Sequence, residues 1–237
     1  MSGGCMSLPK KGVFISFEGG EGVGKSTHVR LLAARLEAAG LDVVCLREPG
    51  GTPIGEKIRT ILLDPANTGM SPMTELLLYE AARSQLVSER IRPALEAGSV
   101  VLCDRYLDST AAYQGAGRSI NPELIEQANA LGSQKVLPDR TIVLLDDLEP
   151  ALGRATEAGA DRLEAEGLAF HRRVAQGFQE LALANPGRIH IIKIAEDKRE
   201  TARLVFQAVA DLFGPGLPQD FNISDELLAE SRREHSR

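Results

Sequence analysis

The sequence has no tryptophan, few cysteines and no apolar run as long as the roughly 18–20 residues that span a bilayer. The cysteines are Cys5, Cys45 and Cys103, an odd number without C-x-x-C spacing, which argues against a disulfide framework. The 4 histidines are scattered, so they indicate no metal-ligand cluster. The first residues lack the apolar segment of a secretory signal peptide. We therefore expect a reduced, cytoplasmic protein that binds no membrane.

Positive charge is also scarce. The chain carries 27 Lys and Arg against 33 Asp and Glu, a net charge of −6, so no basic field favours nucleic acid as a partner. Its 237 residues, 43% of them hydrophobic, are typical of a soluble domain that buries a core. We expect a flexible N-terminus over residues 1–11, one folded domain over 12–213, and a mobile tail over 214–237 with one short helix at Asp225–Arg232.

Short apolar runs rich in Val and Ile alternate with helical patterns along the chain. The predicted strands are Val13–Phe17, Val43–Leu46, Val100–Cys103, Thr141–Leu145 and Ile189–Ile194. The predicted helices are His28–Ala39, Glu56–Leu63, Met73–Ala97, Pro122–Leu131, Leu163–Ala184 and Lys198–Leu212. Mostly continuous apolar runs indicate strands that are covered on both faces. The alternation predicts a three-layer α/β/α fold with a five-stranded parallel sheet.

The unusual polar residues follow the predicted strands directly. GGEGVGKST follows the first strand, REPGGT the second, DRY the third and DD the fourth. The carboxyl ends of parallel strands lie along one edge of a sheet, which is where ligands bind in open α/β folds. The sequence therefore predicts one polar site at this edge.

The first of these clusters fits the P-loop pattern GxxxxGK[ST] between a strand and a helix. In this pattern, backbone N–H groups and the helix N-terminus surround phosphate oxygens. Lys25 is expected to reach the β- and γ-phosphates, and Ser26 to hold Mg²⁺. The residues expected to bind ATP are Gly19, Gly20, Glu21, Gly22, Val23, Gly24, Lys25, Ser26 and Thr27. The fold is thus predicted to be of the P-loop NTPase type.

The reaction is indicated by the end of the third strand. An NKxD motif, typical of GTPases, is missing, and the strand ends Asp104-Arg105 rather than in adjacent acidic residues. An arginine there suits a second anionic substrate, because phosphoryl transfer between two phosphates needs positioned cations. The candidate cations are Arg47, Arg59, Arg83, Arg105 and Arg162.

The set FEGGEGVGKST, REPGGT, LLLYEAAR, DRYLDSTAAYQGAGR and DRLE resembles the bacterial thymidylate kinases over about residues 12 to 212. The resemblance implies transfer of the γ-phosphoryl group of ATP to dTMP with Mg²⁺, a step in dTTP synthesis. It also implies a homodimer, for which the helix Met73–Ala97 offers apolar faces. Two alternatives stay open: another P-loop nucleotide kinase, and a replication-accessory ATPase without a phosphate acceptor.

The resemblance also implies roles for individual residues. Arg105 would bridge the two phosphates while Asp104 organises Mg²⁺, and Tyr79, where the family usually has phenylalanine, would stack on thymine. The residues implied at the acceptor nucleotide are Glu21, Arg47, Glu48, Arg59, Tyr79, Arg83, Arg105, Thr110, Tyr113 and Gln114. Among them Arg83 would reach a base carbonyl, Thr110 and Gln114 the base edge, and Tyr113 would exclude a ribose 2′-hydroxyl. Glu21 would face the deoxyribose 3′-hydroxyl or Mg²⁺; the alternative is that it points to solvent.

A further cation is expected from a lid over residues 153–164, because the variable P-loop residues include no basic one. The candidates are Arg154 and Arg162. The sequence favours Arg162, which lies in the retained DRLE motif and is predicted to open the helix Leu163–Ala184. The competing interpretation of Arg162 is an ion pair with Glu166.

Overall fold

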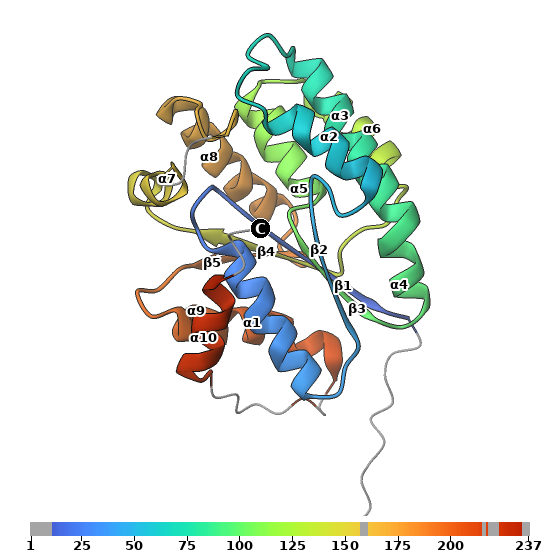
Figure 1. Ribbon diagram of the computed structural model, residues 1–237, viewed down its shortest axis with the longest axis vertical. Coiled ribbons are helices and arrows are strands. Elements are labelled where there is room, and N and C mark those ends of the chain that lie inside the picture. Colours follow the sequence, from blue (N-terminus) through green and yellow to red (C-terminus); the bar gives the residue numbers. More distant parts are fainter. Residues whose placement is uncertain (1–10, 157–160, 215–216, 218–222, 234–237) are drawn as a thin grey trace, which may run out of the picture.

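The computed structural model describes residues 11–156, 161–214, 217 and 223–233 (Figure 1). Its centre is a sheet of five parallel strands in the order β2-β3-β1-β4-β5. The strands are β1 Val13–Gly19, β2 Val43–Arg47, β3 Val100–Asp104, β4 Arg140–Leu145 and β5 Ile189–Lys193. Each lies within two residues of its predicted bounds. β1 lies between β3 and β4, so the loop after β1 opens at the middle of the sheet edge.

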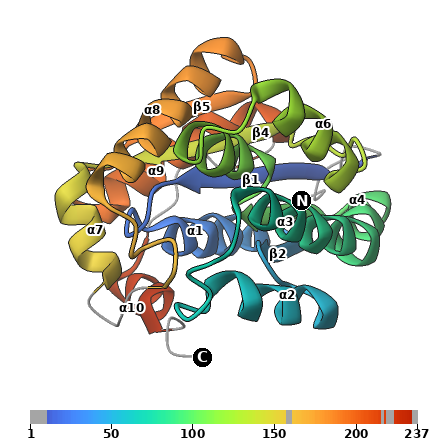
Figure 2. The ribbon, with the colours of Figure 1, turned by 90° about the horizontal axis from the view of Figure 1, so that it is seen from above.

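Helices cover both faces of this sheet, as Figures 1 and 2 show. Alternate residues of β1 face opposite layers. Ile15 and Phe17 join the core beneath α1 (Lys25–Ala38) and α9 (Lys198–Val209), whereas Phe14 joins the core beneath α3 (Pro72–Leu86) and α4 (Arg92–Glu96). The helices are α1 Lys25–Ala38, α2 Pro53–Leu63, α3 Pro72–Leu86, α4 Arg92–Glu96, α5 Leu107–Thr110, α6 Pro122–Gly132, α7 Leu148–Thr156, α8 Leu168–Ala184, α9 Lys198–Val209 and α10 Asp225–Arg233. This arrangement confirms the predicted three-layer α/β/α fold.

Several predicted helices differ in their limits. The pattern over Met73–Ala97 is divided, because a π-helical turn, η1 Val87–Ile91, separates α3 from α4. α8 begins at Leu168 rather than Leu163, because Gly167 is extended, with φ −68° and ψ 158°. α9 ends at Val209, followed by a short 3₁₀ helix, η3 Ala210–Phe213. None of the described helices combines the length and apolar character that crossing a bilayer requires.

Two helical segments were missed by the sequence prediction. α5 continues into a second π-helical turn, η2 Ala111–Gly117, where the sequence is small and glycine-rich. α7 includes Gly153 and Arg154, so the predicted lid begins inside a helix. Residues 157–160 of that lid lie outside the described residues.

The tail also differs from its prediction. The short helix is present as α10, but it packs on the domain instead of standing free of it. Ile223 and Leu228 are buried against Leu31 of α1, and Leu217 is buried in the core around α1 and α9. The expectation of a mobile segment is therefore wrong for these residues. Most of the N-terminal segment 1–11 lies outside the described residues.

Candidate active site

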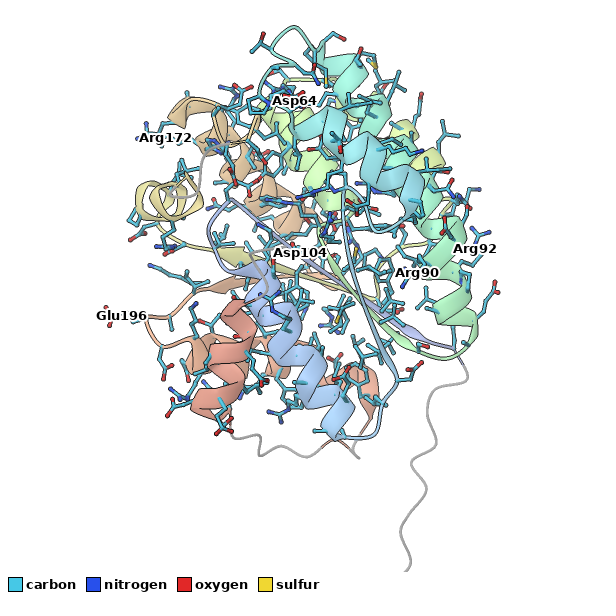
Figure 3. All side chains as sticks on the ribbon, in the orientation of Figure 1. Asp64, Arg90, Arg92, Asp104, Arg172 and Glu196 are labelled. Atoms are coloured by element: carbon cyan, nitrogen blue, oxygen red, sulfur yellow. The ribbon has the colours of Figure 1, made fainter. Side chains whose placement is uncertain are left out.

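The carboxyl ends of β1, β2 and β3 meet at one cavity of about 240 Å³. Arg47 and Asp104 are paired across β2 and β3, and Phe17, two residues before the P-loop, is paired with Asp104. Figure 3 labels Asp104 at the centre of the molecule, near the start of α1. The predicted site residues that line the cavity are Glu21, Lys25, Ser26, Arg47, Glu48, Arg59, Tyr79, Arg83, Asp104, Arg105, Thr110, Tyr113 and Gln114. The expected convergence at the sheet edge is therefore observed for the residues that follow β1, β2 and β3, whereas Asp146 and Asp147, which follow β4, do not line this cavity.

The backbone of the P-loop requires glycine at two positions. Gly24, directly before α1, has φ +85°, and Gly19 has φ +132°. A Cβ on Gly19 would lie 2.3 Å from the carbonyl oxygen of Leu144 on β4. α1 has no acidic residue in its first turn, so its positive end is left for an anion.

Lys25 lies over this loop and is buried. Its Nζ donates to the carbonyl oxygens of Gly20, at 2.6 Å, and Gly19, at 3.3 Å. Burial, together with the charge of nearby Arg105, lowers the pKa of Lys25. The ammonium group of Lys25 interacts here with the partial negative charges of two carbonyl oxygens. A phosphate bound at this position would offer it a full negative charge instead.

Ser26 and Asp104 form a pair beside Lys25. The hydroxyl of Ser26 donates to Oδ2 of Asp104 at 2.5 Å, which joins the P-loop to the end of β3. The described residues hold no group of three His, Cys, Asp or Glu side chains able to enclose a metal ion. One hydroxyl and one carboxylate do match Mg²⁺, which keeps several waters and takes further ligands from substrate phosphates.

Arg105 extends from the end of β3 across the P-loop. One nitrogen of its guanidinium group, Nη1, donates to the carbonyl oxygen of Gly19 at 3.1 Å, and Nη2 lies 2.5 Å from Oε1 of Glu21. The hydroxyl of Tyr113 donates to the same Oε1 at 2.9 Å. Burial alone would raise the pKa of Glu21, but the charges of Arg105 and Lys25 lower this pKa to about 2. Glu21 is therefore an ionised partner of Arg105, and the interpretation that it points to solvent is wrong.

The backbone of Arg105 is held in an unusual conformation by β1. Its φ is +69°, a left-handed value that few residues other than glycine adopt. The N–H of Arg105 donates to the carbonyl oxygen of Phe17, and the N–H of Tyr106 donates to Oε1 of Glu18, both at 2.8 Å. Strained residues of this kind persist where surrounding contacts fix them, and they concentrate at functional sites.

Glu18 was missed by the sequence prediction. Besides the N–H of Tyr106, its carboxyl group binds the hydroxyl of Ser109 at 2.5 Å, and Ser109 in turn accepts from Arg105 at 3.2 Å. Burial, followed by the negative charge of Asp108, raises the pKa of Glu18 to about 8. The only sequence signal was a carboxylate inside an otherwise apolar strand. Glu18 thus supports Arg105 indirectly, through the backbone N–H of Tyr106 and through the hydroxyl of Ser109.

Arg83 lines the cavity but is tied mainly to protein carboxylates. Its Nε and Nη2 bind Glu48 at 2.9 and 2.8 Å, and its Nη1 binds Glu80 and Asn129 at 2.5 and 2.9 Å. These bonds use four of the five N–H donors of a guanidinium group, which leaves one for a ligand. Burial raises the pKa of Glu48 to about 7 although Arg83 opposes this. Oε1 of Glu48 is buried without a hydrogen-bond partner among the described residues.

Another part of the cavity is lined by residues of α3, α5 and η2. Tyr79 is nearly buried in a core cluster with Tyr113. The amide of Gln114 donates to Glu75 at 2.8 Å. The hydroxyl of Thr110 is buried and has no hydrogen-bond partner among the described residues. Buried polar groups are normally satisfied, so this hydroxyl indicates a position where a ligand binds.

Two further arginines, Arg47 at the end of β2 and Arg59 on α2, also line the cavity. Arg47 forms an ion pair with Glu56 at 3.0 Å and is about half exposed. Arg47 and Arg59 both donate to the carbonyl oxygen of Pro49, each at 3.0 Å. These contacts hold two positive charges beside each other at the rim of the cavity, which suits an anionic group.

The two candidate lid arginines are in different places. Arg162 does not line the cavity: it forms an ion pair with Glu75 at 2.6 Å and donates to the carbonyl oxygen of Leu62 at 2.8 Å. The predicted pair with Glu166 is wrong, because Glu166 binds Arg118 at 2.5 Å. The position of Arg162 as the opening residue of α8 is also wrong, because the residues before Leu168 form a turn.

Arg154 lies on the P-loop instead. Its Nε donates to the carbonyl oxygen of Gly22 at 3.2 Å, and its Nη2 binds Asp146, which follows β4. The lid residues that line the cavity are Asp161, Leu163 and Glu164, of which none was predicted. The sequence did not show which residues of the DRLE motif, residues 161–164, face the cavity.

The fold and the site together define a P-loop phosphotransferase, with a phosphate cradle on one side of Arg105 and a cavity lined by charged and polar side chains on the other. Residues 17–205 match the family model described as "Thymidylate kinase". The chain belongs to the thymidylate kinase family.

Individual relatives agree with this assignment. The thymidylate kinase of Deinococcus radiodurans is 48% identical over 204 residues, which cover 85% of this chain and 98% of that protein. The thymidylate kinase of Pelobacter propionicus is 51% identical over 184 residues, 75% of this chain and 84% of that protein. The crystal structure of thymidylate kinase from Ehrlichia chaffeensis has a TM-score of 0.69 at 36% identity, covering 84% of this chain and 99% of that chain.

The role of Glu18 can be tested with two substitutions. Glu18→Ala should lower kcat by about 10- to 100-fold, because a misplacement of about 1 Å in a catalytic group can cost 10²-fold. Glu18→Gln should keep most of the activity, since its amide oxygen still accepts from the N–H of Tyr106. Steady-state kinetics with circular dichroism as a folding control would decide. Equal kcat values for a folded Glu18→Ala and the wild type would show that Arg105 needs no such support.

Proposed function

We propose that this protein is a cytoplasmic thymidylate kinase that transfers the γ-phosphoryl group of ATP to dTMP, giving ADP and dTDP. The observation that carries the proposal is the position of Arg105, whose guanidinium group lies between the P-loop and the acceptor cavity. In an enzyme that only hydrolyses ATP, a water molecule rather than a second substrate would occupy the cavity next to Arg105. A cavity lined by Tyr79, Thr110 and Gln114 instead suits a nucleoside whose base edge offers hydrogen-bond acceptors and donors.

The donor phosphates would bind at the P-loop. The N–H groups at the start of α1 and Nζ of Lys25 face this position, and Lys25 would exchange its two carbonyl partners for phosphate oxygens. Ser26 and Asp104 would hold Mg²⁺, which neutralises part of the phosphate charge when it is bound. Arg105 would contact both the donor and the acceptor phosphate, and Arg47 and Arg59 would hold the acceptor phosphate from the rim.

Glu21 would fix both Arg105 and the sugar. Its hydrogen bonds from Arg105 and Tyr113 both use Oε1. Oε2 has no such bond among the described residues, so it can accept the 3′-hydroxyl of deoxyribose. Tyr113, held by the same carboxylate, would stand against the 2′ position and disfavour a ribonucleotide. The base would lie on Tyr79, with Arg83 offering its one remaining donor to a carbonyl oxygen.

The additional cation for the transferred phosphoryl group is more readily supplied by Arg154 than by Arg162. Arg154 already contacts the P-loop at Gly22, and its other partner is Asp146, directly after β4. To reach the phosphates, Arg162 would have to break its ion pair with Glu75. The buried carboxylate of Glu75 would then lose part of the positive charge that stabilises it. These contacts favour Arg154, whereas the DRLE motif in the sequence favoured Arg162.

A homodimer is proposed through the side formed by α2, α3 and α6, whose helices pack in that order. Large apolar side chains are exposed there: Ile54, Ile61, Met73, Leu77, Leu124 and Leu131. In a symmetric dimer, this face of each subunit would pack against the same face of the other, and the exposed apolar side chains would be buried. Sedimentation should give about twice the single-chain mass of 25.5 kDa, and the single mass at micromolar concentration would reject the proposal.

The activity is tested by measuring ADP formation with and without an acceptor. ADP should appear with dTMP, accompanied by dTDP in equal amount, and should be nearly absent without it. dUMP, dCMP and dGMP serve as matched acceptors; one methyl group is worth about 1–3 kcal/mol in a shaped pocket, so slow turnover of dUMP is expected. ADP formation that ignores dTMP would identify an ATPase, and preference for another monophosphate would identify a different kinase.

The two arginines of the lid region are tested by matched substitutions. Arg154→Ala should lower kcat by about 10³-fold, the lower end of the range for an arginine that stabilises transferred phosphoryl groups. Arg162→Ala should lower the melting temperature more than Arg154→Ala, because it breaks a buried ion pair. Calorimetry without ATP should show dTMP affinity unchanged in Arg154→Ala. Full activity of Arg154→Ala with loss in a folded Arg162→Ala would reverse the assignment.

A further inference from the structure

The C-terminal helix α10 packs against the helix that carries the phosphate-binding loop. In Figure 1 it lies alongside α1, and the two helices are in contact. Leu31 of α1 is 1% exposed and packs in one cluster with Ile223 and Leu228, which are 8% and 6% exposed. Burying these apolar side chains removes them from water and so stabilises the contact between the two helices.

Hydrogen bonds hold α10 at both ends. Arg30 of α1 donates from Nε and Nη2 to the carbonyl oxygen of Ser231, in the last turn of α10, at 3.0 and 2.5 Å. At the other end, Arg199 of α9 donates to the carbonyl oxygen of Ile223 at 3.1 Å and binds Asp225. α10 therefore joins α1 to the beginning of α9.

Arg30 lies only one turn after Ser26, so α10 contacts α1 close to its phosphate-binding end. Among the described residues, those of α9 and α10 do not line the acceptor cavity, and α1 contributes Lys25 and Ser26 to it. In phosphoryl transfer the attacking and leaving oxygens are in line, so donor and acceptor lie on opposite sides of the transferred group. The contacts of α10 thus bear on the donor side of the site.

α10 is also outside the part of the chain that defines the family. The family match ends at residue 205, and 98% of the Deinococcus radiodurans relative is matched by 85% of this chain. The family chemistry therefore does not account for this helix.

We propose that α10 is a positioning element for the donor nucleotide, acting through Arg30 and Leu31 on the start of α1. It adds no group to the reaction. It fixes the orientation of the helix whose N-terminal N–H groups and Lys25 receive the donor phosphates. Many of the residues that line the dTMP cavity belong instead to α2, α3, α5 and η2. This inference rests on ATP as the donor in the proposed function.

The test is Leu228→Asp in the full-length chain, which places a charge in the cluster with Leu31. Glu226→Asp is the matched control, because it introduces the same residue on the exposed side of the same helix. Leu228→Asp should raise the KM for ATP by about three- to tenfold, the size of effects that packed elements exert at a distance. The KM for dTMP should stay within about twofold, as should all values for the control.

A second variant, Arg30→Met, removes the hydrogen bonds to Ser231 and keeps the cluster. It should raise the KM for ATP in the same direction, and it decides the matter if Leu228→Asp does not fold. Equal increases in both KM values would mean that α10 only stabilises the domain, which overturns the proposal. Unchanged KM values for ATP in both folded variants would overturn it too. Failure of the wild type to use ATP would instead reject the proposed function.

Discussion

The geometry of the site depends on how Arg105 is held. β3 delivers this residue to the middle of the sheet edge, where the chain turns with a left-handed φ of +69°. Hydrogen bonds to Phe17 and Glu18 of β1 fix the turn, and bonds to Gly19, Glu21 and Ser109 fix the guanidinium group. A cation that is oriented before substrates arrive needs little reorganisation when charge develops.

This arrangement explains why a P-loop should carry an acidic residue. Glu21 stands among N–H groups that favour anions, and an unpaired carboxylate there would repel phosphate. Paired with Arg105 and Tyr113 it instead holds the pocket together, and its pKa of about 2 keeps it ionised at every pH at which the protein is expected to work. The overall charge of −6 is compatible with an anionic substrate because arginines and Lys25 are gathered at one edge.

The sequence alone predicted the sheet and most of the residues that line the cavity. Continuous apolar runs identify strands that are buried on both sides, and the turn chemistry of Gly19 and Gly24 identifies the loop. The limits of α8, the π-helical turns η1 and η2, and α7 were not predictable, because they depend on packing between helices. Arg162 shows the same limit: its partner, Glu75, is far away in the sequence. Glu18 was missed because the role of a buried carboxylate can be recognised only when its partners, Tyr106 after β3 and Ser109 on α5, are known.

In this proposal Arg105, oriented by Glu21 and Glu18, stabilises the transferred phosphoryl group much more than it strengthens the binding of dTMP, whose phosphate Arg47 and Arg59 also hold. Single-turnover transfer by Arg105→Lys, measured with dTMP affinity by calorimetry, tests it directly. Lysine keeps the positive charge but cannot bind Gly19, Glu21 and the phosphates at once, because it lacks the planar fork. The account predicts a transfer rate lower by about 10²–10³-fold, with dTMP affinity within a few-fold of the wild type. A transfer rate near that of the wild type would contradict it.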